Sequence, residues 1–63
     1  MRNREIREAI AGAGLLYWQV AEQIGITDGN FSRLLRHELT GEKKLRVMAA
    51  IERAVVENKR EAQ

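Results

Sequence analysis

Glycine, not proline, interrupts the helical pattern of this 63-residue chain, which contains five glycines and no proline. Between the glycines, Ala, Leu, Glu, Arg and Lys dominate, and these residues favour helix. Apolar residues recur there at spacings of three and four, the period of a helix that buries one face. The sequence therefore predicts an all-α fold, a small orthogonal bundle of four or five helices.

Capping residues and glycines indicate where these helices begin and end. Thr27 and Thr40 carry hydroxyls that can cap a helix start, and Gly25 can adopt the left-handed conformation that ends one. Asn3 is the candidate cap of the first helix. We interpret residues 1–3 as a short arm and residues 59–63 as a frayed end. The expected helices span residues 3–13, 17–24, 27–37 and 40–58.

A chain of this length forms one domain, residues 1–63, because a small fold has no mass for a second core. It contains no cysteine, so neither a disulfide nor a thiolate metal site can add stability. Helix packing or association must supply that stability instead. No apolar run approaches the roughly 20 residues that a membrane span needs. We expect a soluble protein of the reducing cytoplasm.

Positive charge is concentrated in two parts of the chain, although the formal net charge is only +2. Arg2, Arg4 and Arg7 outnumber the single Glu5 at the start of the chain. From residue 28 to residue 46, five cations accompany three anions. Clustered cations are a weak indication of a nucleic-acid partner.

Five residues form the pattern expected where two helices cross at a tight turn: Ala21, Gly25, Ile26, Phe31 and Leu34. A small residue such as Ala21 permits the close crossing, and a glycine such as Gly25 permits the turn. Phe31 and Leu34 lie one turn apart on the second helix, where they can press into the core. Each residue type alone suits any compact helical bundle. Their order and spacing together predict a helix-turn-helix.

The segment from Leu15 to Thr27 (LLYWQVAEQIGIT), followed by Phe31-Ser32-Arg33-Leu34, resembles the helix-turn-helix of the lambda-repressor and Cro-like regulators. The resemblance covers roughly residues 3–55. It implies a bacterial or phage-encoded transcriptional regulator, typically a repressor, that binds a specific site on double-stranded DNA. The chain departs from the family pattern at Leu16, where a hydroxyl cap is usual, and at Tyr17, where Gln is common. It also lacks a clearly separate fifth helix.

The face of the third expected helix opposite Phe31 and Leu34 carries residue types that read base edges in the major groove. Arg bridges two guanine acceptors, Asn pairs with adenine, Ser contacts several bases, and glycine lets the backbone approach DNA. Asp28 repels phosphate but can accept a hydrogen bond from cytosine. Without the preceding turn, this face would be interpreted as an ordinary solvated surface. The expected readout residues are Asp28, Gly29, Asn30, Ser32, Arg33 and Arg36.

A second group of side chains flanks this helix and is expected to meet phosphate oxygens. Trp18 belongs to this group, but a lone tryptophan more often fills a core edge, and we favour its packing against a neighbouring helix. His37 has no partner at ligand spacing for a metal site or a catalytic triad. The candidate backbone contacts are Tyr17, Trp18, Gln19, Thr27, His37, Thr40, Lys43 and Lys44.

The fourth expected helix carries apolar residues over more than half of its circumference, more than one small bundle can bury. Either its alanines are simply exposed helix formers, or a second face pairs with a twin subunit. We favour a homodimer. The candidate contacts are Val47, Ile51, Ala54 and Val55, and the pattern leaves open which apolar stripe faces the core and which faces the partner.

The main alternative function is a protein-interaction module that reuses this fold and docks through Trp18 or the fourth helix. An enzyme is not expected, because one His, no Cys and no glycine-rich phosphate loop leave only scattered carboxylates. No cofactor, metal or small-molecule ligand is indicated by the residue pattern.

Overall fold

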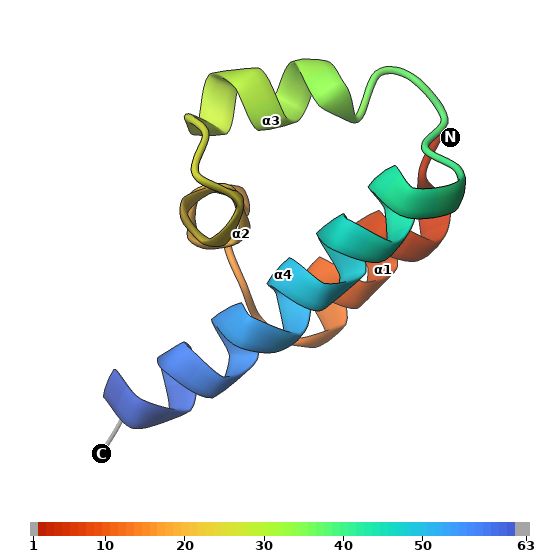
Figure 1. Ribbon diagram of the computed structural model, residues 1–63. Helices are drawn as coiled ribbons and strands as arrows, with labels where there is room; N and C mark the ends of the chain where they lie inside the picture. Colours follow the sequence, from red (N-terminus) through yellow and green to blue (C-terminus); the bar gives the residue numbers. More distant parts are fainter. Residues whose placement is uncertain (1, 62–63) are drawn as a thin grey trace.

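The computed structural model describes residues 2–61, which form four α-helices and no strand (Figure 1). The helices are α1 (Arg4–Gly12), α2 (Tyr17–Ile24), α3 (Asp28–Leu34) and α4 (Gly41–Glu61). α4 runs along the length of the molecule with α1 beside it, and α2 is seen end-on below α3 (Figure 1). α4 packs against α1 and α2, while α2 packs against α3. The chain is therefore a small all-α bundle, and the 21-residue α4 leaves no separate fifth helix within residues 2–61.

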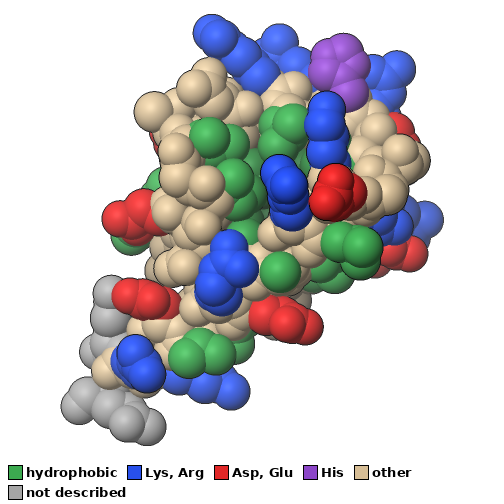
Figure 2. Space-filling view, in the orientation of Figure 1, with side chains coloured by type: hydrophobic (Ala, Val, Ile, Leu, Met, Phe, Trp, Pro, Cys, Tyr) green, Lys and Arg blue, Asp and Glu red, His purple; other side chains and the backbone are tan. Residues whose placement is uncertain are grey.

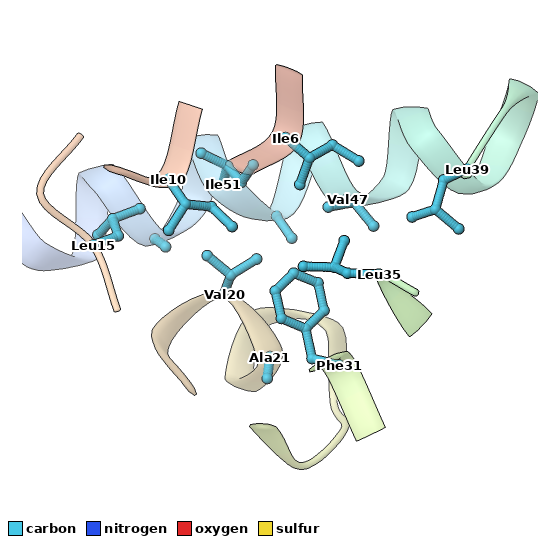
Figure 3. Close-up of a cluster of buried hydrophobic side chains, with 12 residues drawn as sticks. Ile6, Ile10, Leu15, Val20, Ala21, Phe31, Leu35, Leu39, Val47 and Ile51 are labelled. Atoms are coloured by element: carbon cyan, nitrogen blue, oxygen red, sulfur yellow. The ribbon is translucent and has the colours of Figure 1, made fainter. Parts of the chain in front are cut away.

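Twelve buried apolar side chains form one core between the four helices (Figure 3). Ile10 of α1, Val20 of α2 and Phe31 of α3 are each at most 1% exposed. Leu15 and Leu39 close the core from the α1–α2 and α3–α4 connections. The other members are Ile6, Ala21, Leu35, Val47, Ala50, Ile51 and Ala54.

The start of α3 is as predicted, but its end comes earlier. Thr27 caps the helix, because its Oγ1 accepts a hydrogen bond from the Asn30 amide at 3.2 Å. The helix ends at Leu34 instead of continuing to His37, and residues 35–40 lead irregularly to α4. Leu35 still has helical dihedral angles, and its amide donates to the Phe31 carbonyl at 3.0 Å, but the amides of Arg36 and His37 donate to carbonyls only three residues back. Leu35 is fully buried, while Leu34 is only half-buried.

Both ends of the described chain differ from the expected arm and frayed tail. α4 remains helical through residues 59–61, and the fraying expected at Ala62 and Gln63 lies outside the described residues. Asn3 occupies the cap position of α1 with φ 57° and ψ 41°, yet its side chain makes no cap bond. Asn3 is only 4% exposed. Residues 2–3 are therefore packed against the domain and do not form a free arm.

α4 buries one face and exposes the other, and this corrects the expected dimer contacts. Val47, Ile51 and Ala54 are at most 5% exposed and belong to the core of a single chain. Val55 is half-buried and packs against the same core. Periodicity alone could not distinguish the two apolar faces, so the interface prediction was placed on the wrong one. The exposed apolar residues of α4 are Leu45, Ala49 and Val56.

No helix in the described part of the chain combines the length and the apolar character that a membrane crossing requires.

Candidate nucleic-acid interface

The turn between α2 and α3 has the geometry that its residue pattern predicts. Gly25 adopts φ 91° and ψ 29°, a left-handed conformation that residues with a Cβ rarely adopt. The amides of Gly25 and Ile26 both donate to the Ala21 carbonyl, at 2.9 and 3.1 Å. Ala21 is fully buried close to Phe31 of α3 (Figure 3). Backbone geometry and a small side chain therefore hold α3 across α2.

Tyr17 links the start of α2 to both α3 and α1. Its ring and that of Phe31 form an edge-to-face pair, with centroids 5.7 Å apart. Arg7 of α1 donates a hydrogen bond from Nη1 to the Tyr17 hydroxyl oxygen at 3.1 Å. The hydroxyl accepts in this bond, so its own proton can still be donated to a phosphate oxygen.

The six predicted readout residues are all exposed, on α3 or just beyond its end. Arg33 and Arg36 take part in none of the ion pairs of residues 2–61. Asn30 binds Thr27 through its backbone amide, which leaves the side-chain amide out of that bond. Figure 2 shows Lys and Arg side chains gathered over the α3 end of the molecule, beside the histidine. The structure thus presents the six residues at an accessible surface, where their polar side chains can meet a partner.

Gln19 and Thr27, two predicted phosphate contacts, also cap helices. Gln19 Oε1 accepts a hydrogen bond from the amide of Leu16, the cap residue of α2, at 2.7 Å. This bond compensates in part for the hydroxyl that Leu16 lacks at that position. Both caps use an oxygen as acceptor, so the Gln19 side-chain amide and the Thr27 hydroxyl proton stay available as donors.

Trp18 and Lys44 both lie next to other helices of the chain. Trp18 is 49% exposed, and with Gln19 it lines a hollow against the C-terminal half of α4, so it lies beside a neighbouring helix as expected. Lys44 forms an ion pair with Glu5 of α1 at 2.7 Å. The hydrogen bond and charge of Lys44 lower the pKa of the Glu5 carboxyl, and those of Glu5 raise the pKa of Lys44. The remaining contacts beyond α3 are exposed: His37, Thr40 and Lys43.

Asn3 has a role that the sequence interpretation missed. Its Nδ2 donates to the carbonyls of Leu35 and His37, both at 2.8 Å. Its Oδ1 accepts from the Leu39 amide, also at 2.8 Å. One buried side chain therefore binds three backbone groups of the α3–α4 connection.

Two arginines add to this attachment of the N-terminal segment. Arg2 Nη1 donates to the Arg36 carbonyl at 2.7 Å, and Arg7 Nη2 donates to the Leu35 carbonyl at 3.3 Å. We call Arg2, Asn3 and Arg7 the N-terminal clamp. No spacing rule identifies it, because its partners lie about 30 residues further along the chain.

The described residues contain no group of three or more His, Cys, Asp or Glu that could hold a metal ion. An open groove of about 470 Å³ follows the outer side of α4. Its lining combines both signs of charge with surface that is more apolar than polar: Gln23, Ala49, Glu52, Arg53, Val56, Glu57 and Arg60.

Comparisons with known proteins do not extend this description. No protein-family model matched the chain, and neither a curated protein nor a solved structure did. A function must therefore be argued from the residues and the geometry alone.

Proposed function

We propose that this chain binds a specific site on double-stranded DNA as a small helix-turn-helix regulator, with α3 in the major groove. One observation carries the proposal: the exposed face of α3 presents Asn30, Ser32 and Arg33 on a helix fixed by the Gly25 turn. A helix in the major groove needs donors that are not committed to the protein itself. The resemblance to lambda-repressor and Cro-like regulators supports the same function, and suggests repression.

The residue types suggest how contacts are divided. Arg33 and Arg36 suit guanine O6 and N7, Asn30 suits adenine, and Ser32 tolerates several bases. A Cβ at Gly29 would meet nothing closer than 4.0 Å, so the missing side chain suits approach of DNA better than packing within the chain. Phosphate contacts come from Tyr17, Gln19, Thr27, His37, Thr40 and Lys43, whereas Trp18 lies against α4 and Lys44 is paired with Glu5.

Selection from a random duplex library tests the proposal directly. We expect enrichment of a short motif and an affinity that falls steeply with salt, because each neutralised phosphate adds about −0.9 to the logarithmic salt slope. Arg33→Ala with Arg36→Ala should abolish enrichment. The matched control is Arg4→Ala with Lys59→Ala, which removes the same charge from exposed positions outside both the α3 face and the groove beside α4. If the two pairs of substitutions lower enrichment and affinity equally, the binding is charge attraction without sequence specificity.

A homodimer forms part of the proposal, although its interface must differ from the predicted one. A single reading helix covers few base pairs, and two copies related by a two-fold axis read twice as many. The exposed Leu45, Ala49 and Val56 follow one line along α4. Glu52 and Glu57 near this line are balanced by Arg53 and Arg60, which suits pairing of a surface with its own copy.

The groove beside α4 also favours a second candidate function, a protein-interaction module. Leu45 is 70% exposed, and Leu16 is 60% exposed. A partner docked on such surfaces would bind with little dependence on salt and without any need for Arg33. Failure of the library to enrich a motif, together with salt-insensitive partner binding, would favour this candidate.

A further inference from the structure

We propose that the N-terminal clamp positions Arg36 for DNA contact, with Asn3 as a positioning residue that does not touch DNA itself. This inference rests on the proposed function, because it concerns how the same interface is held. It adds a residue from the far end of the sequence to that interface.

The first argument is the path of the main chain. After α3 ends at Leu34, the next segment has left the helix, and three successive carbonyls, of Leu35, Arg36 and His37, accept hydrogen bonds from the clamp. The Leu39 amide closes the segment by donating to Asn3. These bonds fix the backbone on both sides of Arg36, whose side chain is exposed.

The second argument is the choice of residue at position 3. Both Nδ2 protons and the Oδ1 of Asn3 are used, a combination that Asp, Ser or Ala cannot supply. Asn3 also adopts the left-handed backbone at φ 57°, which Asn tolerates better than most residues. A side chain used in full at a strained position indicates that the contact with the connection matters more than a cap for α1.

The third argument is electrostatic. Backbone carbonyl oxygens carry partial negative charge, which repels phosphate. Arg2 and Arg7 cover the carbonyls of Arg36 and Leu35. The clamp therefore reduces that repulsion at the place where the Arg36 side chain must approach DNA.

Arg33 provides an internal comparison. It lies within α3, and its position follows from the helix and the buried Phe31, not from the clamp. Loss of Asn3 should therefore affect contacts of Arg36 and leave contacts of Arg33 in place. A general loss of stability would not distinguish the two arginines.

A double-mutant cycle on the duplex selected by the parent protein tests this inference. Asn3→Gly removes the side chain and tolerates the left-handed backbone, so it isolates the three hydrogen bonds. We expect Asn3→Gly and Arg36→Ala each to weaken binding about 10-fold, and the double variant also about 10-fold, because both remove the same contact. Asn3→Gly combined with Arg33→Ala should instead cost about 100-fold, as independent changes do. Base preference should relax only at the position that Arg36→Ala relaxes.

The cycle is measured well below the thermal midpoint, with circular dichroism to verify that each variant is folded. If Asn3→Gly does not fold, Arg2→Ala replaces it, with Arg4→Ala as the control. Both remove one exposed arginine, but Arg4 pairs with Glu8 and has no place in the clamp. Arg2→Ala should be coupled to Arg36→Ala, and Arg4→Ala should not.

Additive costs for the clamp variant and Arg36→Ala, or equal coupling to both arginines, would overturn the clamp inference while leaving DNA binding intact. A parent protein that binds no duplex at low salt would contradict the proposed function, and the positioning role with it. The two failures are therefore distinguishable in one set of titrations.

Discussion

The ring of Tyr17 stands edge-on to the ring of Phe31, with centroids 5.7 Å apart and planes inclined at 76°. This pair joins the first residue of α2 to the middle of α3. A residue expected to contact phosphate is thereby tied to the helix expected to read bases. The distance between the two kinds of contact is thus set by packing within the chain.

Replacement of Phe31 tests this packing. Phe31→Ala should cost roughly 3–5 kcal/mol of unfolding free energy, because it removes a fully buried ring from a small core. Tyr17→Phe keeps the ring pair and should cost about 1 kcal/mol, mainly the bond from Arg7. Thermal melts followed by circular dichroism measure both. An unchanged midpoint for Phe31→Ala would contradict the observed core.

Glycine substitutions test the turn. Gly25→Ala should destabilise the fold by about 1–2 kcal/mol, because a Cβ is strained at φ 91° even though nothing lies within 4 Å of it. Gly12→Ala is the control. It lies in α1 with equal space around it, and the change should stabilise by about 0.4–1 kcal/mol. If both variants shift the thermal midpoint in the same direction, a Cβ at position 25 is not strained, and the turn does not require the left-handed backbone of Gly25.

Local features of the fold were predictable because they depend on residues close in sequence. The Gly25 turn, the Thr27 cap and the buried Phe31 all follow from spacings within one or two helical turns. The exposed face that we propose for readout follows from the same periodicity, since it lies opposite Phe31 on α3. The early end of α3 did not follow, and the segment after it makes hydrogen bonds to Asn3, more than 30 residues earlier in the chain.

Features set by distant contacts were not predictable. Asn3 fits the sequence rule for a helix cap, and only its partners 32 to 36 residues away show that its side chain is used elsewhere. On α4, apolar residues on both faces left two possible orientations. Packing against α1 and α2 selected the face with Val47 and Ile51, so three of the four predicted dimer contacts are core residues, and Val55 is half-buried beside them.

Arg33 and Lys43 should affect DNA binding in different ways. Arg33→Ala should cost about 1–3 kcal/mol of binding free energy and relax preference at one base position. Lys43→Ala should weaken all sequences alike and reduce the salt slope by about one. Both residues are exposed, so stability should barely change. Parental affinity and base preference for Arg33→Ala would remove it from the readout face.

The Glu5–Lys44 ion pair should produce a small, salt-sensitive dependence of stability on pH. The pKa of Glu5 lies below its ordinary 4.5, so its contribution is present above that pH and is lost as the pH falls through the lowered value. The pKa of Lys44 is raised above 10.5, so its contribution is complete below that pH and is lost as the pH rises further. Carboxyl NMR titration should find a lower pKa for Glu5 in the parent than in Lys44→Gln. Equal values in the two proteins would show that the pair does not form in solution.

The two faces of α4 should respond differently to charge. Ile51→Glu places a carboxylate among core residues and should unfold the chain, because Ile51 is only 5% exposed. Leu45→Glu with Val56→Glu changes side chains that are 70% and 55% exposed, so the helix content should persist. If these residues pair two copies, the exposed-face variant should sediment as a monomer and lose affinity for an inverted repeat.

In the parent, the half-sites should recur about 10 to 10.5 base pairs apart, or at a multiple, since two α3 helices would enter successive major grooves. A parent that stays monomeric at tens of micromolar, free and on DNA, and that selects one asymmetric element would exclude the dimer. Charge on the exposed face would then change neither sedimentation nor affinity beyond the general repulsion of phosphate that two added carboxylates produce.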